Sequence, residues 1–178
     1  MSMLGMGIFP FLFYYLYAIV PLAPFVYLFV KWRAYRDGRA GDPWLGAVVL
    51  LHYFWTLALH LALFGLTFSC AGLLKGQRAE ELKPGLGLLS AGVIALLAVV
   101  FVLARVPRSP LRPQVWRVFN ALNLLLCGLL ALVALVAASI MLAEGKWADV
   151  RLPLVALVIF GAAWSWFMRL LLPKTKNM

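Results

Sequence analysis

Charge is scarce in this chain, and acidic charge is scarcest: six Asp and Glu residues stand against sixteen Lys and Arg among 178 residues. Charged residues make up 12% of the sequence and hydrophobic residues 65%, whereas soluble domains are about a quarter charged and about half apolar. A soluble domain of this length has too much surface for its volume to bury so many apolar side chains. The composition therefore excludes a soluble fold and a disordered chain, and indicates an integral membrane protein.

Cysteine and histidine are also rare, with two of each. Two cysteines exclude a disulfide-rich scaffold, and Cys70 and Cys127 fall at different depths of different apolar stretches, which disfavours a bond between them. The sequence lacks a phosphate-binding glycine loop, a serine nucleophile elbow and a Cys-x-x-Cys pair. These absences disfavour an enzyme, and we predict no catalytic residue, no metal site and no cofactor.

Long apolar stretches remain when the chain is cut at its charge clusters. A transmembrane helix needs about twenty apolar residues, and the stretches are continuous and rich in leucine and alanine rather than alternating, which favours helices over barrel strands. We predict an all-α integral membrane protein in which residues 1–178 form one transmembrane domain without a soluble domain. The predicted bundle has five transmembrane helices, at about 8–30, 44–74, 86–104, 118–143 and 152–172.

The distribution of Lys and Arg between the connecting segments predicts the orientation. Alternate segments hold eleven basic residues on one side and five on the other, and the richer side is expected in the cytoplasm. This places the N-terminus outside and the C-terminus in the cytoplasm of a multi-pass cell-membrane protein. The abundance of Leu, Ala, Gly and Arg suggests a bacterial inner membrane.

The third connecting segment is basic and rich in proline. This segment, residues 105–117, contains Pro107, Pro110 and Pro113, so we expect it to be extended. Because it contains no acidic residue, we expect it to contact anionic lipid headgroups or an acidic face of a partner. Topology explains the net charge of +10, so no nucleic-acid partner is expected. Trp32, Trp44 and Trp116 should mark the same membrane boundary. The four arginines of the segment are Arg105, Arg108, Arg112 and Arg117.

The second predicted span carries polar side chains along one side. At 100° per residue, the members of this stripe fall within an arc of about 80°. Polar groups at membrane depth are costly and usually face the bundle or a wet cavity, so we predict that the stripe faces protein and forms a polar interior or pathway. Its members are His52, Thr56, His60, Thr67 and Cys70.

The two histidines admit several interpretations. A haem is commonly held between imidazoles of facing helices, but His52 and His60 lie on one helix, eight residues or about 12 Å apart. One iron would then need a methionine or a second subunit as its other ligand. The His–Cys spacing fits no zinc pattern. A proton or substrate relay remains open, and the favoured interpretation is a neutral histidine bonded to a neighbouring helix.

The third and fourth predicted spans carry packing signals. Gly87, Ala91 and Ala95 recur every four residues, which predicts a ridge of small residues for helix packing. Asn120 and Asn123 begin a stripe on the fourth span that becomes small further along, which predicts a buried face. An asparagine amide and a neutral imidazole are matched hydrogen-bonding partners. We therefore expect the face of His52 and the asparagine face to look toward a common interior.

The first predicted span contains two prolines well inside its bounds, Pro21 and Pro24. Each removes a backbone hydrogen bond and clashes with the preceding turn, so a kink is expected. Tyr14 and Tyr17 fall on roughly the side of Pro21, and this face could line a cavity. A kink satisfied by packing is the favoured alternative.

These features lead to three hypotheses about function. The first is a non-enzymatic subunit or accessory protein of a larger inner-membrane complex, in contact with other subunits or with further copies of itself. The second is a small transporter or channel that uses the polar stripe and the proline-kinked first span. The third is an electron-transfer subunit with b-type haem.

Overall fold

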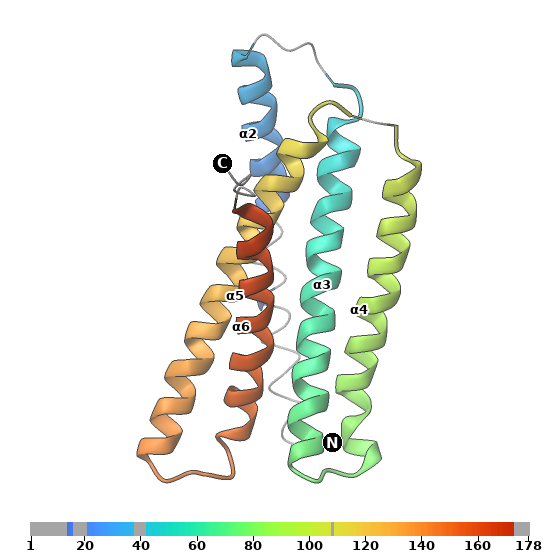
Figure 1. Ribbon diagram of the computed structural model, residues 1–178. Helices are drawn as coiled ribbons and strands as arrows, with labels where there is room; N and C mark the ends of the chain where they lie inside the picture. The colour runs from blue at the N-terminus through green and yellow to red at the C-terminus, as the bar shows by residue number, and fades with distance from the viewer. Residues whose placement is uncertain (1–13, 16–20, 38–41, 108, 173–178) are drawn as a thin grey trace, which may run out of the picture. The chain divides into compact units, whose positions relative to one another are not determined.

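The computed structural model describes residues 14–15, 21–37, 42–107 and 109–172. Four of its helices are long and apolar enough to cross a membrane within this described part of the chain. A shorter helix, α2, precedes them (Figure 1). The helices are α2 (Leu22–Arg36), α3 (Leu45–Leu74), α4 (Ala79–Arg105), α5 (Arg112–Ala143) and α6 (Arg151–Leu171).

The predicted all-helical membrane fold is confirmed at this level, since α3 to α6 correspond to the second to fifth predicted spans. The fifth crossing and the orientation stay predictions, because α2 has 15 residues and most of the preceding stretch lies outside the described residues. Helices α4 and α5 each begin more than one turn before the predicted spans. Helix α4 begins at Ala79, with Glu80 and Glu81 in its first turn, where carboxylates are favoured by the helix dipole.

The expected extended conformation of the basic segment 105–117 is wrong in its second half. Helix α5 begins at Arg112, so Arg112 and Arg117 are helical residues. The physical reason is the proline pattern: Pro110 lies in the turn just before the helix and Pro113 lies in its first turn, and a missing N–H costs nothing at either position. Prolines that suggested an extended segment are therefore compatible with helix initiation.

The described helices contribute to two compact units. Unit 1 comprises residues 1–60 and 91–118, and unit 2 comprises residues 61–90 and 119–178. Unit 1 contains the connections from α2 to α3 and from α4 to α5, whereas unit 2 contains those from α3 to α4 and from α5 to α6. Alternate connections thus belong to the same unit, as expected of successive membrane crossings.

In unit 2, two glycines end helices in the same way. Gly76 and Gly145 have positive φ values of 68° and 71°, a conformation that glycine adopts without a Cβ penalty. After α3, the N–H of Gln77 donates to the carbonyl of Gly72 at 3.1 Å; after α5, the N–H of Lys146 donates to that of Met141 at 2.9 Å. These bonds are those of the Schellman motif, which satisfies the last carbonyls of a helix.

In unit 2, Arg151 at the start of α6 contacts the C-terminal end of α3. Its Nη1 donates a hydrogen bond to the carbonyl of Leu74 at 2.7 Å. Leu74 is the last residue of α3, and a cation is favoured at the C-terminal end of the helix dipole. The bond joins the start of α6 to the end of α3.

Close backbone contact between α3 and α4 in unit 2 depends on glycine. A Cβ on Gly65 would clash with the backbone nitrogen of Leu89, and one on Gly85 would lie 2.8 Å from the hydroxyl of Ser69. Around Gly87, by contrast, nothing lies within 4 Å of an added Cβ, and Ala91 is exposed. The predicted ridge of Gly87, Ala91 and Ala95 therefore does not form the contact between α3 and α4, which runs through Gly65 and Gly85 instead.

In unit 2, ring packing between Phe64 and Phe160, with centroids 5.2 Å apart, brings α3 and α6 together.

The predicted buried face of α5 is confirmed for most of its residues. Ala131 is only partly buried. The buried members of the face are Asn120, Asn123, Cys127, Ala134 and Ala138.

Candidate functional site

Helix α3 begins with an aspartate cap. The N–H of Trp44 donates to Oδ1 of Asp42 at 2.9 Å, and the N–H of Leu45 donates to the carbonyl of Asp42 at 3.2 Å. Pro43 occupies the next position, where its fixed φ suits a helix and no N–H is needed. The Asp42 side chain thus satisfies one of the donors that a helix start leaves unpaired.

Helix α5 begins with a serine cap of the same design. The N–H of Leu111 donates to Oγ of Ser109 at 3.2 Å, and Pro110 lies between the two residues. The Ser109 hydroxyl in turn donates to Oδ2 of Asp42. The two caps are therefore bonded to each other, which places a carboxylate beside the positive ends of two helix dipoles in unit 1.

Sequence analysis missed both Asp42 and Ser109 as important residues. The available signal was local: Asp-Pro and Ser-Pro each stand immediately before an apolar helical stretch, a pattern that marks an N-cap followed by the first helical position. No local signal showed that the two caps meet, because they are 67 residues apart in the sequence.

A pocket of about 640 Å³ lies beside the serine cap in unit 1. One part of its lining is polar, with Ser109 and Arg112, and His52 adds an imidazole. The indole of Trp116 packs against His52 and against Trp55, with ring centroids 5.6 and 5.2 Å apart. The full lining is His52, Trp55, Val100, Leu103, Ser109, Arg112, Pro113 and Trp116.

Both histidines are oriented by the backbone of their own helix. Nδ1 of His52 lies 2.7 Å from the carbonyl of Val48, and Nδ1 of His60 lies 2.9 Å from that of Thr56. A carbonyl can only accept, so Nδ1 carries the proton in each ring, and Nε2 is the acceptor nitrogen of the neutral form. The His60 ring also packs against Tyr15, with centroids 5.7 Å apart.

The polar stripe of α3 is an internal feature. His52, Thr56, His60 and Thr67 are all at most 2% exposed. The Thr67 hydroxyl donates to the carbonyl of Leu63 at 2.8 Å, which satisfies it within the helix. Burial shows that these side chains face protein, while their use as a pathway stays a prediction.

The asparagines of α5 belong to unit 2. Asn123 Nδ2 donates to the carbonyl of Phe119 at 2.8 Å, so part of its bonding capacity is used within the helix. Asn120 is 1% exposed, and its Oδ1 has no hydrogen-bond partner among the described residues. His52 belongs to unit 1, and a common interior for the histidine and asparagine faces stays a prediction.

The remaining predicted residues are dispersed. Pro21 is the N-cap of α2 and Pro24 lies in its first turn, positions at which proline is tolerated. The predicted kink stays untested because residues 16–20 lie outside the described part, as do Tyr17 and Arg108. Tyr14 is 71% exposed.

Two further arginines of the basic segment lie away from the pocket. The guanidinium of Arg105 stacks over the Phe101 ring at 3.9 Å, and Arg117 is exposed on α5. Only Arg112 among the described arginines of the segment lines the pocket with His52. Within the described ranges, no three His, Cys, Asp or Glu side chains are grouped as a metal ion would require.

Comparison of the chain with models of known families, with curated proteins and with solved structures produced no match.

Proposed function

We propose that this chain is a non-enzymatic accessory subunit of a larger bacterial inner-membrane complex, and that it holds a lipid with an anionic headgroup at the predicted cytoplasmic boundary. The observation that carries this proposal is the pocket in unit 1, which combines the guanidinium of Arg112 with the indoles of Trp55 and Trp116. A cationic rim on an apolar wall matches the two ends of an anionic amphiphile.

The chemistry of the lining supports a phosphate-bearing ligand. An arginine offers a planar fork of donors that suits phosphate oxygens. Tryptophan is favoured at the depth of the lipid headgroups, where one end of the ring is apolar and the other is wet. The volume of about 640 Å³ falls in the usual range for small-molecule sites.

The retention of lipid by matched variants tests this part of the proposal. The protein is purified in mild detergent with phosphatidylglycerol, and bound lipid is measured by native mass spectrometry. Arg112→Gln should lower the amount of bound phosphatidylglycerol about tenfold, since a lost charge-assisted contact is worth more than 1 kcal/mol. Arg117→Gln is the control, because Arg117 lies on the same helix but outside the pocket. Equal retention by the two variants would refute lipid binding at Arg112.

The exposed surface of α4 supports membership in a complex, because the rest of this chain buries little of that helix. Only 6% of the most apolar 18-residue stretch of α4 is buried, against 44% for α3. Helix α4 therefore offers most of its circumference to lipid or to other subunits. Cross-linking in native membranes followed by native gel electrophoresis should show the chain in a species larger than a monomer. Migration as a monomer alone would contradict the role as a subunit.

A transporter is the second candidate, and one arrangement in unit 1 favours it. A series of polar groups lies in that unit: His52, Thr56 and His60 are buried, and the Tyr15 ring packs against His60. Such a series is typical of a proton or substrate relay. Proteoliposomes with a pH-sensitive dye inside should then show proton flux that His60→Leu abolishes. Flux equal to that of empty liposomes would remove this candidate.

A further inference from the structure

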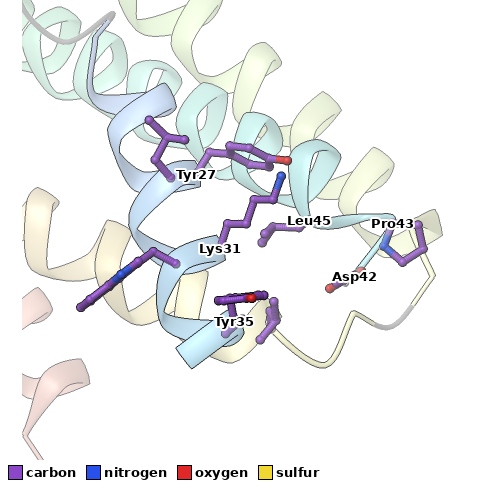
Figure 2. A pocket seen from close by; sticks show the side chains of 10 residues that line it. Tyr27, Lys31, Tyr35, Asp42, Pro43 and Leu45 are labelled. Atoms are coloured by element: carbon purple, nitrogen blue, oxygen red, sulfur yellow. The ribbon is translucent and has the colours of Figure 1, made fainter. Parts of the chain in front are cut away.

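A second pocket of unit 1 lies between α2 and the start of α3. Its volume is about 870 Å³, and Figure 2 shows Tyr27, Lys31 and Tyr35 of α2 on one side, with Asp42, Pro43 and Leu45 on the other. The Tyr27 ring also approaches α3, since a Cβ on Gly46 would lie 3.9 Å from it. The lining is completed by Leu28, Trp32, Ala34 and Leu111.

The pocket contains one charge of each sign. The ammonium of Lys31 lies 5.6 Å from the centre of the Tyr27 ring, and in Figure 2 the Lys31 side chain extends from α2 toward that ring. The Asp42 carboxylate lies on the α3 side and is held in place by the Trp44 N–H and the Ser109 hydroxyl. Among the described residues, Lys31 and Asp42 form no salt bridge with each other.

Aromatic side chains of α2 also line the pocket. Tyr27, Trp32 and Tyr35 all line the pocket, and Trp32 already carries the guanidinium of Arg36 at 5.2 Å from its ring centre. Tyr35 is 85% exposed, so its ring is open to a ligand. A cation is attracted to the face of such a ring, and a nearby carboxylate attracts the same cation.

We propose that this pocket binds the headgroup of a zwitterionic phospholipid with a primary amine, phosphatidylethanolamine. Lys31 and the Tyr27 hydroxyl donate to the phosphate, while Asp42 accepts from the ammonium group beside the Tyr35 ring. Leu28, Leu45 and Leu111 contact the apolar part of the lipid. One lysine and one aspartate complement a ligand that has one charge of each sign.

The same charges disfavour other phospholipids. An anionic headgroup without an amine places its phosphate near Lys31 but leaves Asp42 without a cation. The negative charges of the phosphate and of Asp42 then repel each other. A trimethylammonium group has no N–H, so it cannot donate to the oxygens of Asp42. The inference goes beyond the proposed function, because neither Lys31 nor Tyr35 lines the pocket of Arg112.

Competition between lipids tests the proposal on the full chain. Delipidated protein in mild detergent receives equal amounts of phosphatidylethanolamine, phosphatidylcholine and phosphatidylglycerol, and native mass spectrometry counts the bound lipids. For Arg112→Gln protein, in which the first pocket is disabled, phosphatidylethanolamine should exceed each other lipid about tenfold or more, which corresponds to one hydrogen bond to a charged group. Equal binding of the three lipids would overturn the proposal.

Variants locate the bound lipid. Lys31→Gln should lower bound phosphatidylethanolamine about tenfold and Tyr35→Leu about threefold. Arg33→Gln is the matched control, since Arg33 is exposed on the same helix and does not line the pocket. Lys31→Gln and Tyr35→Leu keep the cap of α3 intact, so a loss cannot arise from that helix end. Equal binding by Lys31→Gln and Arg33→Gln would place the lipid elsewhere and refute the assignment.

A soluble headgroup separates the lipid from a free ligand. O-phosphoethanolamine at the same concentration as the lipid should displace almost none of it, because the soluble compound lacks contact with the apolar wall. Displacement of half the bound lipid under these conditions would show that the headgroup alone suffices, and the assignment to a lipid would be wrong.

Discussion

The bond between the caps of α3 and α5 allows a quantitative test of the fold of unit 1. Ser109 is 6% exposed, so water cannot readily replace its hydroxyl. Ser109→Ala removes the acceptor for the N–H of Leu111, worth about 1 kcal/mol for an N-cap. It also removes the donor to the Asp42 carboxylate, worth about 1.5 kcal/mol or more for a charged partner. We expect the free energy of unfolding to fall by about 2.5 kcal/mol.

A double-mutant cycle isolates the bond between the two caps. Asp42→Ala removes the cap of α3 together with the same bond to Ser109. The double variant loses that shared bond only once. The sum of the losses in unfolding free energy of the two single variants should therefore exceed the loss of the double variant by about 1.5 kcal/mol. The measurement is SDS-induced unfolding from mild detergent micelles, monitored by tryptophan fluorescence.

Serine 139 provides the control for this cycle. Its hydroxyl is exposed and donates to the carbonyl of Leu135 within α5 at 2.9 Å. Ser139→Ala should therefore change the free energy of unfolding by less than about 0.5 kcal/mol. A coupling energy between Asp42 and Ser109 below about 0.5 kcal/mol, the usual error of additivity, would refute the argument that the caps stabilise each other.

Two further predictions concern unit 2. Gly65→Ala should lower the free energy of unfolding by about 2 kcal/mol or more through overpacking against the backbone of Leu89, whereas Gly87→Ala should leave it unchanged or raise it by up to about 1 kcal/mol; equal effects would contradict the assigned helix contact. Arg151→Met should lower the same free energy by about 1 kcal/mol through loss of its bond to the end of α3. Lys146→Met, which removes only an exposed ion pair with Glu144, should cost less, and the reverse order would disprove the capping role.

The membrane character, the helices α3 to α6 and the polar side of α3 can all be predicted from the amino-acid sequence. These are local properties: apolar length decides whether a segment can cross a bilayer, and the angular period of a helix decides which residues share a face. The burial of His52 and His60 can be predicted as well, because exposing an imidazole to lipid is costly. Helices α4 and α5 begin before the predicted spans because apolar length defines a span, whereas caps and first-turn charges define the helix.

Which helices touch, and at which residues, is seen only from their packing in three dimensions. Gly65 and Gly85 pack against a neighbouring backbone and Gly87 does not, although all three are small residues on apolar helices. Asp42 and Ser109 were recognisable as helix caps from the prolines that follow them, yet their contact joins residues 67 positions apart. The second pocket joins the lysine and aromatic rings of α2 to Asp42 before α3 and to Leu111 before α5. Such contacts depend on how helices pack in space, and the spacing of residues along one helix contains no information about its neighbour.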